Sequence, residues 1–200
     1  MKLNLWERAL VNNPVRALLQ HHLEARLLLS KGGRLEGKRV LEIGCGRGVG
    51  VEVIFKRFGA GHVTALDLDP AMIEQAKQRL SHIPADKLTL SVGDATAIKA
   101  PDAEFDAVFD FGIVHHIPDW QGAIREVARV LKPGGLFLFE EIAKKALDRW
   151  VTRTFLDHPT ENRFSLKAFL AEMERQGIRP QGEVTTVWFG DIFIGVGRRT

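Results

Sequence analysis

The segment that most constrains the fold of this 200-residue chain is Val40-Leu41-Glu42-Ile43-Gly44-Cys45-Gly46-Arg47-Gly48. Apolar residues that favour β-strands run into an acid and then into a glycine at every second position. Glycine permits positive φ angles and lets the backbone approach a ligand closely. Because a helix with a periodic apolar face follows, the segment is typical of a nucleotide-binding element. It predicts an α/β fold with a ligand at the carboxyl end of the first strand.

The spacing of the glycines indicates which nucleotide binds. A dinucleotide site needs the pattern G-x-G-x-x-G/A, and counting from Gly44 its third small position falls on Val49. The chain reads G-x-G-x-G, so a branched side chain stands where a pyrophosphate-binding helix needs a small one. This pattern argues against NAD and FAD. The chain also contains no tyrosine, which removes one common proton donor of a nicotinamide-dependent reductase.

Later segments repeat the pattern of an apolar strand that ends in an acid. The strand His62–Asp67 ends roughly twenty residues after the glycines, where a carboxylate can accept hydrogen bonds from both ribose hydroxyls. A third strand runs from Leu88 to Asp94, and a fourth from Phe105 to Phe111 leads into His115-His116. The chain continues with a helix over Gly122–Leu131, the turn Lys132-Pro133-Gly134-Gly135 and a fifth strand over Leu136–Glu140.

Taken in order, these segments resemble the motifs of class I S-adenosylmethionine-dependent methyltransferases. The matching stretches are VLEIGCGRG, VTALDLDPAMIEQAK, LSVGDA, FDAVFDFGIVHHIPD and REVARVLKPGGLFLFEE. They most resemble the small-molecule branch, methyltransferase type 11, which includes ubiquinone/menaquinone-biosynthesis and phospholipid methyltransferases. The resemblance implies S-adenosylmethionine as the cofactor. It also implies a doubly wound, Rossmann-like α/β sheet of seven strands, mostly parallel, with an antiparallel C-terminal hairpin and flanking helices.

We expect one domain, because 200 residues with 45% hydrophobic content can bury a full core. Residues 1–37 would form an N-terminal helical lid, residues 38–142 the cofactor-binding core, and residues 143–200 the substrate-side helices and the terminal hairpin. Within the last part the sequence predicts a helix over 144–155, a polar loop over 156–162, a helix that Ser165 caps and Gly177 ends, and strands over 183–189 and 192–196.

The resemblance assigns the cofactor contacts to the strand ends. Glu42 would lie near the methionyl ammonium, with a first-turn helix charge as the structural alternative. Asp67 would hold the ribose hydroxyls, or else cap a helix before Pro70. Asp94 would accept from the adenine amino group, or else only shape a turn. The remaining expected contacts are Gly44, Cys45, Gly46, Gly48, Leu68, Met72, Ala95 (through its amide), Phe111 and Gly112, of which Met72 and Phe111 could instead be core residues.

Catalytic residues are harder to assign, because methyl transfer is an in-line displacement with a good leaving group. Much of the rate can come from holding the nucleophile close and aligned, so no general base is obligatory. His115 and His116 follow the fourth strand and could take a proton from an acceptor, although in this family such a pair often binds backbone. Glu140 and Glu141 end the fifth strand and are candidate substrate contacts, with a helix-start charge as the alternative.

The N-terminal arm is basic and amphipathic. Residues 1–39 carry eight bases and three acids, a net charge of +5 against +3 for the whole chain. Asn13-Pro14 predicts the start of a second helix. If both helices roof the active site, Trp6 would contact the acceptor. The alternative is a basic surface that makes peripheral contact with anionic lipid. Asp157 and His158 in the polar loop are further residues that could close over a substrate.

These patterns predict transfer of a methyl group to a small or lipophilic acceptor, with release of S-adenosylhomocysteine. A nucleic-acid methyltransferase and a non-catalytic S-adenosylmethionine-binding protein remain alternatives. Nucleic acid is disfavoured because no aromatic stripe is present to stack bases. In addition, the site of the proline-containing tetrapeptide of base-methylating members reads Asp110-Phe111-Gly112-Ile113.

Cysteine usage and the N-terminal sequence bear on location and metal chemistry. The single cysteine, Cys45, excludes the four-cysteine chemistry of an arsenite methyltransferase and suits a reducing compartment. The start of the chain has an early acid and no long apolar run, so we expect a cytoplasmic protein without a signal peptide. No residue pattern indicates a metal site, and the oligomeric state is not set by the sequence.

Overall fold

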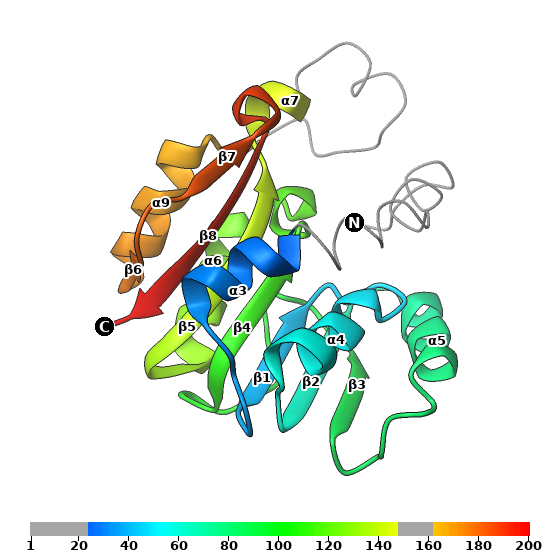
Figure 1. The fold of residues 1–200 in the computed structure, drawn as a ribbon. Coiled ribbons are helices and arrows are strands. Elements are labelled where there is room, and N and C mark those ends of the chain that lie inside the picture. Colours follow the sequence, from blue (N-terminus) through cyan, green and yellow to red (C-terminus); the bar gives the residue numbers. More distant parts are fainter. Residues whose placement is uncertain (1–23, 148–161) are drawn as a thin grey trace.

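An eight-stranded sheet forms the centre of the molecule (Figure 1), for which a computed structural model describes residues 24–147 and 162–200. The strand order is β3-β2-β1-β4-β5-β8-β6, and β7 pairs with β8 beside this path. The first five strands are parallel to one another, and the last three are antiparallel to their partners. The strands are β1 Arg39–Ile43, β2 His62–Asp67, β3 Leu88–Val92, β4 Phe105–Phe111, β5 Leu131–Ile142, β6 Ile178–Pro180, β7 Thr185–Val187 and β8 Ile192–Arg199.

The strand order reverses between β1 and β4. On one side of β1 the chain builds β2 and then β3, and on the other side it builds β4 and then β5. At the carboxyl end of β1, Ile43 stands beside Leu66 of β2 and beside Asp110 of β4. In open α/β sheets, ligands bind outside the carboxyl ends of the strands at such a reversal. We call this end of the parallel strands the carboxyl edge, and the opposite end the amino edge.

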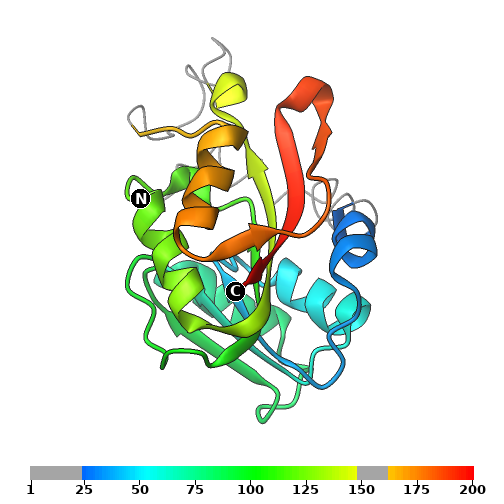
Figure 2. The same cartoon turned by 90° about the vertical axis from the view of Figure 1, so that its left-hand side faces the viewer.

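Helices cover both faces of the sheet (Figure 2). Two separate core clusters correspond to the two faces, and β5 alternates between them, with Phe137 and Phe139 in one and Leu136 and Leu138 in the other. One face carries α6 (Trp120–Val130) and α9 (Leu166–Arg175). The other carries α3 (Ala25–Gly32), α4 (Val49–Val53) with its π-helical extension η2 (Ile54–Phe58), and α5 (Pro70–Arg79).

Three helices begin at side-chain caps that the sequence already contains. The Asp69 carboxylate accepts from the Ala71 amide at 3.0 Å, directly before Pro70. Asp119 caps α6 and Ser165 caps α9 in the same way. Such caps satisfy backbone donors that a helix start leaves without partners. The predicted helix start at Ser165 is therefore confirmed, and α9 ends at Arg175, two residues before Gly177.

The main differences from the sequence prediction lie on the C-terminal side of the sheet. The sheet has eight strands rather than seven, because the short strand β6 pairs with the end of β8. Strand β5 starts at Leu131 rather than Leu136, since pairing of Leu131 with Phe105 continues across the Pro-Gly-Gly turn through a register shift. Strand β7 is only three residues long, because the 3-10 turn η4 (Trp188–Gly190) replaces its predicted end. Helix α6 starts at Trp120, where Asp119 caps it.

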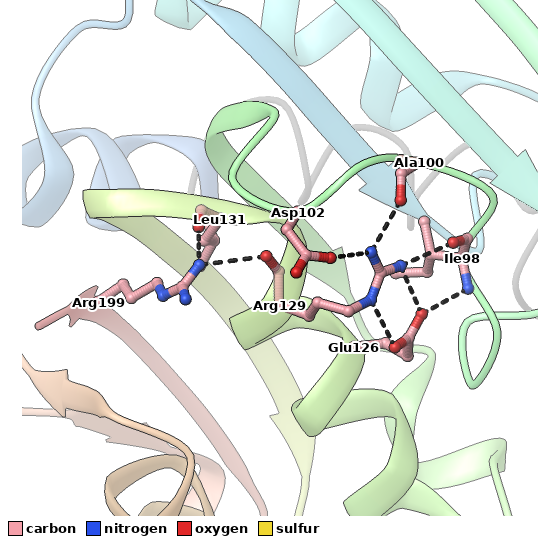
Figure 3. A network of polar contacts seen from close by, with 7 residues as sticks. All are labelled: Ile98, Ala100, Asp102, Glu126, Arg129, Leu131 and Arg199. Carbon is pink, nitrogen blue, oxygen red and sulfur yellow. Dashed lines mark hydrogen bonds and ion pairs between the residues drawn. The ribbon is translucent and has the colours of Figure 1, made fainter.

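Figure 3 shows how polar contacts hold the amino edge together. The Arg129 guanidinium donates to the Asp102 carboxylate and to two loop carbonyls, each at 2.8 Å, and it also binds Glu126. The Arg199 side chain donates to the carbonyl of Arg129 at 3.1 Å. These contacts join the loop before β4, the end of α6 and the end of β8. The network consists of Ile98, Ala100, Asp102, Glu126, Arg129, Leu131 and Arg199.

Several predictions fall outside the described residues. These are the two lid helices with Trp6 and Asn13-Pro14, the helix beyond α7 (Lys144–Leu147), and the loop with Asp157 and His158. The described part of the N-terminal arm, α3, packs on the sheet: a Cβ on Gly32 would stand 2.9 Å from Leu138 of β5. Within residues 24–147 and 162–200, no helix is both long and apolar enough to cross a membrane.

Candidate active site

The loop after β1 depends on glycines for its shape. Gly44, Gly46 and Gly48 have φ angles of 67°, 51° and 86°, in the region that side chains rarely adopt. A Cβ on Gly44 would collide with Ile113, whereas a Cβ on Gly46 would meet no atom within 4 Å. The loop therefore packs tightly against the turn after β4 at its start. At its middle it leaves the backbone open to a ligand.

Asp67, at the end of β2, binds this loop. Its carboxylate accepts from the Gly46 amide at 2.8 Å and from the Asp69 amide at 2.9 Å. The structural alternative considered for Asp67, a helix cap before Pro70, belongs to Asp69 instead. Asp67 thus orders the glycine loop next to the place where a ribose is expected. Cys45 in the same loop is buried, and its amide donates to the Leu66 carbonyl at 2.9 Å.

The residues expected around the adenine lie at the ends of β2 and β3. The Asp94 carboxylate accepts from the amide and the hydroxyl of Thr96, both at 2.8 Å, so it also shapes a turn. Leu68 is 44% exposed. Val92, which no sequence motif indicates, is 48% exposed. Leu68 follows Asp67 in the chain, and Val92 of β3 pairs with Asp67 of β2 in the sheet. Both apolar side chains therefore lie beside Asp67. Two further expected contacts, Met72 and Ala95, are buried.

Glu42 is a buried carboxyl group that forms no ion pair with the residues that the structure describes. It is 2% exposed, and its Oε2 atom has no hydrogen-bond partner among the described residues. Burial, together with the nearby charges of Asp67 and Asp110, raises the pKa of Glu42 well above its usual range. A Cβ on Gly50 would collide with its Oε1 atom, so this glycine makes room for the carboxyl group. Burying a carboxyl group unpaired is costly, and a cationic ligand would remove that cost.

A second buried acid, Asp110, holds the turn after β4. Its Oδ1 atom accepts from the amides of Gly112 and Ile113 at 3.1 and 2.9 Å. Burial and the neighbouring Glu141 carboxyl raise the pKa of Asp110. Gly112 has a φ of 82°, and the Phe111 ring stacks on Phe109 with centroids 5.4 Å apart. Asp110 was not expected to shape the site; its signal was an acid near the carboxyl end of a strand that is apolar apart from Asp106.

Glu141 is fully buried and is bound by several donors of the protein. It accepts from the Val114 amide at 2.6 Å and from the Ile142 amide at 3.1 Å. It also contacts the Nδ1 atom of His115 at 2.6 Å. Burial raises the pKa of Glu141 to about 7. With Nδ1–H donating to this carboxylate, the lone pair of the neutral His115 ring is on Nε2.

The other candidate polar side chains lie close by. The His116 ring is 4.2 Å from the His115 ring, centroid to centroid, and both residues belong to the 3-10 turn η3 (Val114–His116). Both histidines are buried, at 6% exposed. Glu140 is 3% exposed and points to the opposite face from Glu141, because neighbouring residues on a strand alternate. Protein donors hold the Glu141 carboxylate, and Glu140 lies on the other face of β5.

The carboxyl edge thus combines an open glycine loop with buried acids. In the described part of the chain, neither Glu42 nor Asp110 forms an ion pair with a lysine or an arginine. This arrangement defines a nucleotide-cofactor site whose acidic wall suits a positively charged ligand. S-adenosylmethionine carries both an ammonium and a sulfonium group, so the residues present fit this cofactor.

Comparisons with known proteins agree with this geometry. Residues 41–139 match the family model described as "Methyltransferase domain". A probable phthiotriol/phenolphthiotriol dimycocerosates methyltransferase of Mycobacterium ulcerans is 41% identical over 108 residues, which are 54% of this chain and 41% of the relative. A 2-methyl-6-phytyl-1,4-hydroquinone methyltransferase of Synechocystis is 29% identical over 180 residues, 81% of this chain and 55% of the relative. The chain therefore spans about half the length of these curated relatives.

The fold comparison gives the same result. An S-adenosylmethionine-dependent methyltransferase from Aquifex aeolicus superposes with a TM-score of 0.77 at 22% identity, over 100% of both chains. This chain belongs to the class I S-adenosylmethionine-dependent methyltransferases, and its cofactor is S-adenosylmethionine. The predicted family, Rossmann-like fold class and cofactor are thereby confirmed.

Proposed function

We propose that this chain transfers a methyl group from S-adenosylmethionine to a small lipophilic acceptor and releases S-adenosylhomocysteine. The observation that carries the proposal is the buried Glu42 beside an open glycine loop. Its Oε2 atom has no hydrogen-bond partner among the described residues, which suits a cationic cofactor. The two relatives described above are named for lipid-like acceptors, a dimycocerosate and a phytyl hydroquinone. Their names support a lipophilic acceptor here.

The strand ends would hold the cofactor as follows. Glu42 would face the methionyl ammonium and would also complement the sulfonium charge. Asp67 would accept from the ribose hydroxyls, and Asp94 would accept from the adenine amine. Leu68 and Val92, both exposed, would pack on the adenine ring. At the positive-φ positions the backbone would approach the cofactor closely. The apolar residues among these contacts would pack against the cofactor. Those further contacts are Gly44, Cys45, Gly46, Gly48, Met72, Ala95, Phe111 and Gly112.

His115 is the residue that we assign to proton transfer, with His116 as its neighbour. When bound, the cofactor supplies an electrophilic methyl group, and the protein has to align an acceptor atom with it. An oxygen, nitrogen or acidic carbon acceptor also has a proton to lose. Glu141 orients the His115 ring through Nδ1, so that Nε2 is the atom that would receive this proton. Glu141 is thus a positioning residue.

The acceptor itself would lie beyond this turn. Glu140 would contact its polar end, and the N-terminal arm with Trp6 would cover its apolar part. To test the arm, residues 1–23 should be deleted rather than the whole segment 1–37, because α3 packs on the sheet. We expect the deletion to abolish transfer and to leave cofactor binding intact. Full activity after the deletion would show that the arm is not a lid.

Product release provides the test of the function. S-adenosylhomocysteine formation is measured over quinone precursors, fatty acids, phospholipids, polar metabolites and short nucleic acids, with Asp67→Ala as the control for cofactor binding. We expect turnover with a lipophilic acceptor only. Turnover with nucleic acid would favour the nucleic-acid alternative. Cofactor binding without turnover on any acceptor would favour a non-catalytic binding protein.

A further inference from the structure

Trp188 is the most exposed of the large apolar side chains in the described residues, at 66%. It begins η4, the turn that joins β7 to β8. Its φ angle is 53°, which is rare for a bulky side chain and strains the backbone. The chain therefore holds a tryptophan outward on strained backbone and gains little burial in return. Because burial of the side chain does not offset this backbone strain, we expect Trp188 to contact something outside the chain.

The turn lies at the carboxyl edge, near the candidate active site. Val187 of β7 pairs with Ile192 of β8, and Ile192 pairs with Ile142 at the end of β5. Trp188 follows directly after Val187 and so lies just beyond the end of β5, the strand that carries Glu140 and Glu141. In Figure 1 this turn and α7 occupy the same end of the molecule.

Two lysines of α7 lie beside this turn. The Ala143 amide donates to the Asp191 carbonyl at 2.7 Å, which joins the start of α7 to the turn. The Nζ atom of Lys145 would stand 2.8 Å from a Cβ on Gly190. Lys144 and Lys145 are both exposed. We call Trp188, Lys144 and Lys145 the tryptophan tip.

We propose that the tryptophan tip docks on an anionic lipid surface. A tryptophan ring has an apolar body and a polar N–H group, and it prefers the interface between water and lipid. Lysines beside it are attracted to anionic headgroups. The inference rests on the proposed function in one respect: docking here would bring the carboxyl edge to the phase that holds a lipophilic acceptor.

Vesicle sedimentation with the full chain tests the proposal. The vesicles are phosphatidylcholine alone and phosphatidylcholine with phosphatidylglycerol. We expect salt-sensitive binding to the anionic vesicles only. The double variant Lys144→Gln/Lys145→Gln should weaken this binding roughly 25-fold, about fivefold per lysine. The pair Lys38→Gln/Lys87→Gln removes the same charge from exposed positions at the amino edge, and it should leave binding within about twofold.

Trp188→Gly separates docking from a structural role. Glycine adopts positive φ without strain, so the variant should keep or raise the melting temperature while weakening vesicle binding about tenfold or more. A lower melting temperature would show a structural tryptophan and overturn the proposal. So would unchanged vesicle binding in this variant and in the lysine pair, or binding to an acidic protein but not to vesicles.

Cofactor titration of the same proteins distinguishes the two proposals. Trp188, Lys144 and Lys145 have no assigned contact with the cofactor, so S-adenosylmethionine should bind equally well to the wild type and to all three variants. Absence of vesicle binding in a wild-type chain that binds and turns over the cofactor would remove only the lipid-docking inference. Failure of the wild type to bind or use the cofactor would remove the proposed function.

Discussion

Asp106 and Asp110 lie near opposite ends of β4, and the two carboxyl groups have opposite environments. Burial disfavours the charge of Asp106, but a hydrogen bond from Lys132 at 2.9 Å and one from the Arg39 amide at 2.9 Å outweigh it and lower its pKa. Burial and Glu141 raise the pKa of Asp110 instead. At the amino edge of β4, hydrogen bonds from Lys132 and Arg39 thus stabilise the charged form of Asp106. At the carboxyl edge, burial disfavours the charged form of Asp110.

The same contrast holds for the two edges as a whole. At the amino edge, Arg39 pairs with Glu104 at 2.7 Å, and Arg129 pairs with Asp102. At the carboxyl edge, Glu42 and Asp110 are buried with raised pKa values. Perturbed acids of this kind gather at functional sites. Among the described residues, the acids of the amino edge thus have lysine or arginine partners, whereas Glu42 and Asp110 at the carboxyl edge have none.

The largest effect that we expect is on stability, from Glu141→Ala. The change leaves the amides of Val114 and His115 and the His115 ring without their buried acceptor, which costs roughly 3–5 kcal/mol. Urea unfolding measures the loss. Glu104→Ala at the amino edge is the matched control and should cost under about 1 kcal/mol, because its ion pair with Arg39 is partly exposed. Equal losses from the two variants would contradict the comparison between the edges.

Cofactor affinity should depend more on Asp67 than on Asp94. Two charge-assisted hydrogen bonds to ribose, each worth roughly 1.5–3 kcal/mol, predict that Asp67→Ala raises the dissociation constant on the order of tens to hundreds of fold. Asp94→Ala removes one bond to the adenine amine and should have a smaller effect. Calorimetric titration with S-adenosylmethionine gives both values. Small, equal effects would mean that the ends of β2 and β3 are misassigned.

The pH dependence of stability separates raised from lowered pKa values. Folded Glu141, with a pKa of about 7 against an ordinary 4.5, keeps a proton that the unfolded chain releases in this window. Stability without cofactor should therefore fall as pH rises from about 4.5 to about 7, by roughly 2–3 kcal/mol. Asp106 acts in the opposite sense: its contribution is present above its ordinary pKa and is lost as pH falls through its lowered one. The free energy of unfolding is measured at several pH values for the wild type and for Glu141→Gln. The variant should lose the fall in stability that Glu141 causes, and an unchanged pH dependence would contradict this prediction.

The smallest effect should come from Lys132→Gln. The ion pair of Lys132 with Asp106 is partly exposed, at 40% and 20% of the two side chains, so its loss should cost about 0.2–1 kcal/mol. Cofactor affinity should not change, because the pair lies at the amino edge. Thermal unfolding and titration of the same variant check both statements. A large loss of affinity would show that the two edges are coupled.

The sequence predicts the parallel half of the sheet well. The strands β2, β3 and β4 have nearly their predicted ends, because each is an apolar run closed by an acid or a turn. The cap at Ser165 is a local signal and was found. Strand β6 was missed because Ile178–Pro180 is too short to show a period, and its pairing with the end of β8 is a tertiary contact.

The site residues that the sequence predicts are those that lie within a local sequence motif. The glycines, Glu42 and Asp67 lie in motifs, and the structure brings them together at one edge. The contact between Glu141 and His115 was not predictable, since it joins side chains 26 residues apart in sequence. Val92 was missed for a similar reason, because its exposure depends on β3 being the edge strand of the sheet.

A calorimetric titration of the wild-type chain with S-adenosylmethionine and with NADH decides which nucleotide cofactor the carboxyl edge binds. We expect S-adenosylmethionine to bind and NADH not to bind. We also expect Glu42→Gln to weaken binding of the cationic cofactor more than binding of S-adenosylhomocysteine, which lacks the sulfonium charge. A chain that binds NADH and ignores S-adenosylmethionine would contradict the assignment. Equal weakening of both sulfur compounds would show that the acidic carboxyl edge does not recognise the sulfonium charge.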